Sequence, residues 1–121
     1  METLAQPLLD ALYDPARMTD SYREQLYGWV AAYVRRRARD PVPMEKKREQ
    51  MNMVNPKYVF RNYLAQLSID RAEQSDFSMI HELLELLRRP YDEQPGKEKF
   101  AAKRPDWARN RPGCSMLSCS S

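Results

Sequence analysis

A chain of 121 residues and 14.3 kDa has room for one small domain at most. Hydrophobic residues make up 42% and charged residues 31%, and three glycines against nine prolines leave little room for β-hairpins or glycine-rich phosphate loops. The net charge of +3 does not by itself indicate a nucleic-acid-binding protein, and no apolar run approaches the roughly 18 residues of a membrane span.

The first forty residues predict two helices. Between Leu4 and Tyr13, leucines recur at helical spacing, and Pro7 suits a first helical turn. Thr19 and Asp20 then form a start signal, with a capping hydroxyl followed by an acid at the positive end of the helix dipole. The second helix carries six apolar residues at helical spacing: Tyr22, Leu26, Trp29, Val30, Tyr33 and Val34.

Two more helices are predicted after a charged helical segment over residues 44–54. Asn55 and Pro56 indicate a helix start, with Asn as the cap and Pro at the first helical position. That helix would run to about Gln74 and bury Val59, Phe60, Tyr63, Leu64 and Leu67. Asp76 can cap a last helix, which ends before Pro90 and whose apolar stripe is Ile80, Leu83, Leu84 and Leu87.

The composition changes after residue 89, where four prolines punctuate a charged stretch, Pro90, Pro95, Pro105 and Pro112. We therefore predict an all-α fold, with a small array of four to five helices over residues 1–89. An extended proline-rich tail over residues 90–121 would follow it and wrap over a surface. An array of this size buries too little apolar surface to be stable by itself.

The N-terminus, Met-Glu-Thr-Leu, has neither the positive nor the apolar region of a signal peptide. We therefore expect a cytoplasmic location, where Cys114 and Cys119 would be mostly reduced.

A resemblance to a known family begins in the stretch 51–66, MNMVNPKYVFRNYLAQ. It resembles the Asn-Pro-Lys-Tyr-(Val/Ile)-Leu-Arg-Asn-Tyr-Leu-Ala signature near the C-terminus of selenoprotein-O-like protein adenylyltransferases, the YdiU family. Further blocks follow in family order and spacing: DFS at 76–78, LLELL at 83–87, RPYDEQP at 89–95, RPDWA at 104–108 and SCSS at 118–121. The resemblance covers the chain from about residue 20 onward.

The resemblance implies a parent protein with a kinase-like core that binds ATP with Mg²⁺ or Mn²⁺ and transfers AMP to protein hydroxyl groups. It also implies that this helical region packs on that core, so the expected partners are the missing core or the parent enzyme's protein substrates, with no nucleic acid and no membrane. Some family members carry selenocysteine near the C-terminus, and Cys119 stands at the corresponding place. A redox role for the Cys119 thiol follows from the resemblance alone.

None of the nucleotide chemistry is visible in the 121 residues. A phosphate loop needs clustered glycines, whereas Gly28, Gly96 and Gly113 are far apart. A kinase-like site needs a lysine on a strand and metal-binding Asp or Asn residues, and no strand is predicted here. We therefore assign no catalytic, cofactor-binding or metal-binding residue, and expect the chain alone not to transfer AMP.

The family signature supplies the candidate site residues. We interpret their role as packing and hydrogen bonding against the absent core, and a direct part in positioning nucleotide or substrate is the alternative. The residues are Asn55, Pro56, Lys57, Tyr58, Arg61, Asn62 and Tyr63.

Three other patterns allow both a structural and a functional interpretation. Asp76-Phe77-Ser78 is similar to the kinase Asp-Phe-Gly metal motif, but no His-Arg-Asp precedes it, so a helix cap is favoured. His81 and Glu82 match half of a zinc-protease helix without its second histidine, which favours a surface or satisfied histidine. The basic stretch 35–39, with 46–48, could meet phosphate or acidic protein surface, although a solvated helix end is favoured.

Of the cysteines, Cys114 is interpreted as a bystander or a fallback partner for Cys119. Our leading hypothesis is a truncated or partial reading frame of a protein adenylyltransferase, in which Met1 is an internal methionine or a misread start. A stand-alone helical protein-interaction module is the alternative, and a basic nucleic-acid-binding module comes third.

Overall fold

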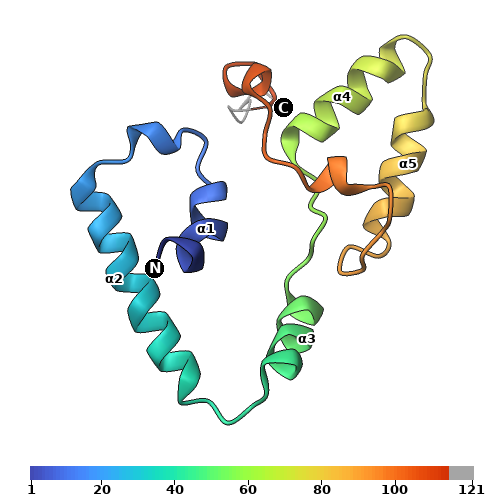
Figure 1. Cartoon of the computed structure of the whole chain (residues 1–121). Helices are drawn as coiled ribbons and strands as arrows, with labels where there is room; N and C mark the ends of the chain where they lie inside the picture. Colours follow the sequence, from blue (N-terminus) through green and yellow to red (C-terminus); the bar gives the residue numbers. More distant parts are fainter. Residues whose placement is uncertain (115–121) are drawn as a thin grey trace. The chain divides into compact units, whose positions relative to one another are not determined.

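The computed structural model describes residues 1–114 of the chain (Figure 1). Within these residues the secondary structure is helical, with no β-strand, which confirms the prediction of an all-α fold. The α-helices are α1 (Glu2–Asp10), α2 (Asp20–Ala38), α3 (Met44–Val54), α4 (Asn62–Glu73) and α5 (Ser78–Leu87). Short 3₁₀-helices lie at η1 (Pro15–Arg17), η2 (Glu98–Ala101) and η3 (Asp106–Arg109). None of these helices is both long enough and apolar enough to cross a membrane.

The chain forms two compact units, Met1–Met44 and Glu45–Ser121. The second unit therefore contains α3, α4 and α5 together with the segment that follows them. The predicted boundary at residue 89, between the helical region of the parent family and the tail, stays a prediction.

In the first unit, α1 packs against α2, and the two fully or nearly fully buried side chains are Ala5 and Val30. The predicted cap of α2 is confirmed, because Thr19 Oγ1 accepts a hydrogen bond from the Tyr22 backbone N–H at 3.2 Å. The prediction for Pro7 is wrong, since α1 begins at Glu2 and Pro7 lies in its interior. A helix of nine residues tolerates one missing backbone donor there, although an interior proline weakens it.

The start signal predicted at Asn55 and Pro56 is wrong, because α4 begins only at Asn62. Asn55 instead closes α3, donating hydrogen bonds from its backbone N–H and its Nδ2 to the Met51 carbonyl at 2.9 and 2.8 Å. The residues between the helices run extended, and Val59 and Phe60, expected to be buried, are 48% and 55% exposed.

A tight turn joins α4 to α5. Ser75 has a positive φ of 62°, its N–H donates to the Ala72 carbonyl, and the Asp76 N–H donates to the Arg71 carbonyl. This pair of bonds is the Schellman motif, which usually carries glycine at the position held by Ser75. The N-cap of α5 is Phe77 and not the predicted Asp76, but Asp76 Oδ1 accepts hydrogen bonds from the N–H and Oγ of Ser78, the first residue of α5.

The buried face of α5 differs from the predicted stripe. Leu83 is buried as expected, but Met79 and Leu86 bury the rest of the face, whereas Ile80 and Leu84 are exposed. The buried face of α5 differs from the predicted one because the side chains that pack on it come from the tail as well as from α4. Leu87, also predicted, is partly buried against the core.

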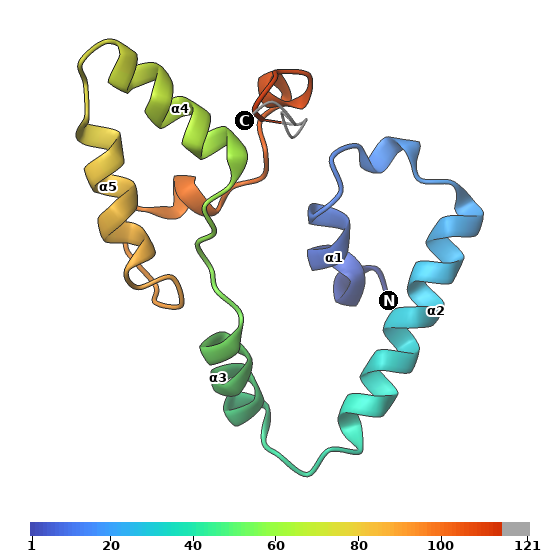
Figure 2. The ribbon, with the colours of Figure 1, turned by 180° about the vertical axis from the view of Figure 1, so that it is seen from behind.

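The segment after α5 returns across α4 and α5, as both views show (Figures 1 and 2). It contributes Phe100, Ala108 and Cys114 to a core that also holds Tyr58, Tyr63, Leu64, Met79, Leu83 and Leu86. Gly113 fits because its φ is +83°, and a Cβ there would lie 2.7 Å from the Gln66 side chain. The described part of the tail, residues 90–114, thus has only short 3₁₀-helices and supplies part of the core.

Candidate functional site

The candidate site is the family signature segment, which the returning tail holds in an extended conformation. The backbone N–H groups of Lys57 and Tyr58 both donate to the Pro90 carbonyl, at 2.8 and 3.1 Å. The Lys57 ammonium also forms an ion pair with the Glu93 carboxylate, and this hydrogen bond raises the pKa of Lys57. We call these contacts, with those of Gln94 and Ala102 described next, the tail clasp.

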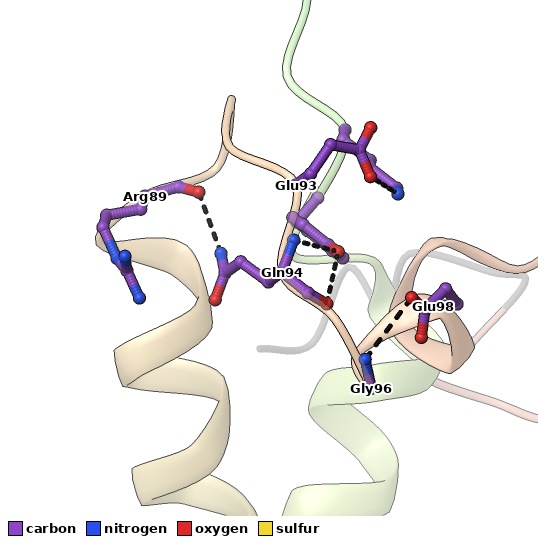
Figure 3. Close-up of polar contacts among 7 residues, drawn as sticks. Arg89, Glu93, Gln94, Gly96 and Glu98 are labelled. Carbon is purple, nitrogen blue, oxygen red and sulfur yellow. Dashed lines mark hydrogen bonds and ion pairs between the residues drawn. The ribbon is translucent and has the colours of Figure 1, made fainter.

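Gln94 is the centre of the tail clasp (Figure 3). Its Nε2 donates to the carbonyls of Leu86 and Arg89 at 3.0 and 2.9 Å, which satisfies backbone acceptors at the C-terminal end of α5. Its backbone N–H donates to the Tyr58 hydroxyl at 3.3 Å, and that hydroxyl lies 3.4 Å from the Gln94 carbonyl. One glutamine therefore joins the signature segment to the end of α5.

The other end of the signature segment is tied to the Ala102 carbonyl. Arg61 Nη1 donates to it at 2.7 Å, and the Tyr63 hydroxyl donates to it at 3.4 Å. Tyr58 and Tyr63 are buried, at 1% and 6% exposure, so their rings pack in the core while their hydroxyls reach the tail. The exposed pair Val59 and Phe60 lies between these two attachment points.

A second polar contact fixes the tail further along. Arg111 donates two hydrogen bonds to the Asp70 carboxylate, both at 2.7 Å, in the bidentate geometry of a strong ion pair. The Arg111 hydrogen bonds, with one from Gln66 at 2.9 Å, lower the pKa of Asp70. The Arg111 guanidinium also lies 5.7 Å from the centre of the Trp107 ring.

Within residues 1–114, no group of three or more His, Cys, Asp or Glu side chains could hold a metal ion. His81 is exposed on α5, and its neighbour Glu82 accepts a hydrogen bond from Lys97 at 2.6 Å, which lowers the pKa of Glu82. In the described residues, the signature segment and the tail form a junction held by hydrogen bonds and an ion pair.

Several proteins similar to this chain carry the name "Protein nucleotidyltransferase YdiU". The protein of Aromatoleum aromaticum is 54% identical over 115 residues, covering 95% of this chain and 22% of its own length. The protein of Rhodopirellula baltica is 56% identical over 117 residues, which cover 94% of this chain and 22% of the relative's length. That of Methylobacillus flagellatus is 52% identical over 121 residues, with 97% and 23% covered. No protein-family model matches the chain.

This chain belongs to the YdiU family. It spans about 22% of the length of the relatives that it matches, consistent with the C-terminal region of the family. The resemblance noted in the sequence is therefore confirmed.

The structure brings together some of the signature residues of the YdiU family and leaves others apart. Lys57, Tyr58, Arg61 and Tyr63 meet the tail within the chain itself. Asn55, Pro56 and Asn62 are exposed: Asn55 ends α3, Pro56 follows it, and Asn62 opens α4. Whether any of them positions nucleotide or substrate stays a prediction.

Sequence reasoning missed the tail side of this YdiU-family junction. Gln94, Phe100, Ala108 and Arg111 lie in a stretch without helical periodicity, so no apolar repeat marks the buried ones. The nearest signal is that the RPYDEQP and RPDWA blocks match the family, which points to constrained positions without naming their contacts. Cys114, interpreted as a bystander, is a free thiol buried in the core. Cys119 lies outside the described residues.

Proposed function

We propose that this chain is the C-terminal helical region of a protein adenylyltransferase, whose remaining part catalyses the reaction. In that reaction a Ser, Thr or Tyr hydroxyl of a target protein attacks the α-phosphorus of ATP, the AMP ester forms, and pyrophosphate leaves. The observation that carries the proposal is the 52–56% identity, over nearly the whole chain, to proteins named protein nucleotidyltransferase YdiU.

ATP and Mg²⁺ or Mn²⁺ belong in this proposal to the parent protein. The residues present do not fit them, because the described part of the chain holds neither a metal-binding group nor a glycine-rich loop. No step of the transfer is therefore assigned to these residues. Their proposed role is to pack on the kinase-like core, in the cytoplasm, without nucleic acid or membrane as a partner.

The experiment compares three proteins for transfer of radiolabelled AMP to a protein acceptor. They are this chain alone, the A. aromaticum relative without its matching segment, and a chimera in which this chain replaces that segment. We expect no transfer by the chain, and transfer by the chimera that exceeds that of the shortened relative. A chimera no more active than the shortened relative, although folded, would refute the proposal.

A stand-alone helical interaction module remains the second candidate, and the self-contained core of the second unit favours it. Thermal unfolding followed by circular dichroism separates the two. A weak, broad transition that sharpens when the relative's core is added supports the severed region. A sharp transition that the core leaves unchanged supports the independent module.

Cys119 is proposed, from its place in the family pattern, to be a redox-active thiol. Mass spectrometry of the chimera under mild oxidation would test this, with Cys119→Ser as the comparison. Formation of a Cys119 disulfide supports the role, and a thiol that stays reduced while others oxidise contradicts it.

A further inference from the structure

The two helices of the first unit form a groove between them. Its volume is about 400 Å³, and it is lined by Leu4, Pro7 and Leu8 of α1 and by Trp29, Val30, Tyr33, Val34 and Arg37 of α2. Most of this lining is apolar, and Trp29 and Tyr33 are 57% and 43% exposed. Large aromatic side chains in such a position are typical anchors of protein interfaces.

The side chains that line the groove on α2 contact one another. The Trp29 and Tyr33 rings stack with centroids 5.5 Å apart and an angle of 8° between their planes. The Arg37 guanidinium lies 5.8 Å from the centre of the Tyr33 ring. Ala5 and Val30, both buried, hold α1 against α2. A partner would therefore lose little free energy in ordering these side chains.

Charge distinguishes one end of the groove. Arg37 lies in its lining, and Arg35, Arg36 and Arg39 belong to the same end of α2. An apolar segment that binds here is best matched if it carries acidic side chains beside that end.

We propose that this groove binds an apolar helical segment with acidic residues at one end, supplied by the remaining part of the parent YdiU-family protein. The relatives are several times longer than this chain, so the same polypeptide contains ample sequence to cover the groove. Helix-in-groove binding is the recognition mode that an apolar channel between two helices suits. The inference rests on the proposed function, which it deepens by naming the docking surface and its partner's chemistry.

The test uses hydroxyl-radical footprinting, in which mass spectrometry reports how fast each exposed aromatic side chain is oxidised. It compares the full 121-residue chain with the chimera described above. We expect Trp29 and Tyr33 to be oxidised roughly tenfold more slowly in the chimera, because the bound segment excludes solvent. Unchanged oxidation of Trp29 in a folded chimera would overturn the proposal. Protection of Trp29 in the chain alone that increases with its concentration would also overturn it, in favour of a second copy.

Matched variants of the chimera test the surface and its charge. Arg37→Glu should restore oxidation of Trp29, whereas Arg23→Glu, elsewhere on the same helix, should not. Gln25→Ala serves as a second control on an exposed position of α2 outside the groove. Equal effects of Arg37→Glu and Arg23→Glu would contradict the acidic match.

A second experiment, with peptides as probes, tests the proposal if the chimera fails to fold. The probes are two short helix-forming peptides with leucines at helical spacing, one ending in glutamates and the other in lysines. The glutamate peptide should protect Trp29 of the chain at a roughly tenfold lower concentration. No protection, or no preference, overturns the proposal.

AMP transfer is measured separately on the same chimera. An active chimera with unprotected Trp29 refutes the docking surface and leaves the proposed function standing. An inactive, folded chimera in which Trp29 is protected refutes the proposed function and leaves the docking surface standing.

Discussion

The two units of the chain differ in how far each covers its own apolar side chains. The second unit buries nine core residues, drawn from the signature segment, two helices and the tail. The first unit buries Ala5 and Val30 and leaves Tyr22, Trp29 and Tyr33 exposed. A folded region of a larger protein can thus contain one part that packs by itself and another whose apolar surface is suited to a partner.

The largest expected effect tests whether the second unit depends on the tail clasp. Tyr58→Ala removes a buried ring and its hydroxyl contact with Gln94, and should lower the free energy of unfolding by about 3–5 kcal/mol. Urea denaturation followed by circular dichroism measures it. Tyr58→Phe is the matched control and should cost only about 1 kcal/mol, since it loses the hydroxyl alone. A Tyr58→Ala variant as stable as Tyr58→Phe would show that burial of the Tyr58 ring does not support the core.

An intermediate effect concerns the Asp70–Arg111 contact. Because Arg111 lowers the pKa of Asp70, the ionised carboxylate stabilises the folded state above its unfolded pKa of about 3.9. That contribution is lost as the pH falls from there through the lowered pKa of the folded state. Asp70→Asn should therefore be less stable at neutral pH and lose less stability on acidification.

Urea midpoints measured between neutral pH and pH ~3 give the comparison for Asp70→Asn. Asp106→Asn, on an exposed residue of η3, is the control and should follow the unsubstituted chain. Parallel pH curves for Asp70→Asn and the unsubstituted chain would rule out the linkage.

A smaller effect, of opposite sign, is expected at the turn between α4 and α5. Ser75→Gly should raise the free energy of unfolding by about 0.5–1 kcal/mol, because glycine adopts the positive φ of 62° without steric cost. The shift of the thermal midpoint measures it, with Ser75→Ala as the comparison. If Ser75→Gly and Ser75→Ala melt together, backbone strain at this position is negligible.

The smallest effect is expected in the first unit. Trp29→Ala in the isolated chain should change the free energy of unfolding by no more than about 0.5 kcal/mol, since the ring is 57% exposed. Urea denaturation of the chain alone tests this. A loss as large as that of Tyr58→Ala would mean that the first unit uses Trp29 in its own packing, and the contrast between the units would fail.

Local signals in the sequence predicted what local contacts determine. The Thr19 cap and the helix over 44–54 depend on neighbours within a few residues, and both are found in the structure. Asp76 accepts from the N–H of Ser78 at the start of α5, although the N-cap itself is Phe77. The all-α class and the family also follow from the sequence.

Contacts with distant residues account for the errors. Asn55 and Pro56 look like a helix start, yet the next residues run extended because Lys57 and Tyr58 donate to the carbonyl of Pro90. The face of α5 was misjudged because Phe100 and its neighbours, absent from any periodic pattern, share the core with it. The candidate site was predicted on its helix side through the signature, while its tail side could not be derived from a single sequence.

The contacts that fix the tail join residues far apart in the sequence, and this affects folding during synthesis. Tyr58 and Gln94 are 36 residues apart, and the pairs Arg61–Ala102 and Asp70–Arg111 are each 41 residues apart. Helices α4 and α5 can form as a hairpin from local contacts. The clasp closes only after residue 102 has left the ribosome, and the Asp70–Arg111 contact forms only after residue 111 has done so. Until then the apolar faces of α4 and α5 lack the cover that Phe100 and Ala108 later provide. A nascent chain paused between α5 and the tail is therefore the stage at which chaperone binding or aggregation is most expected.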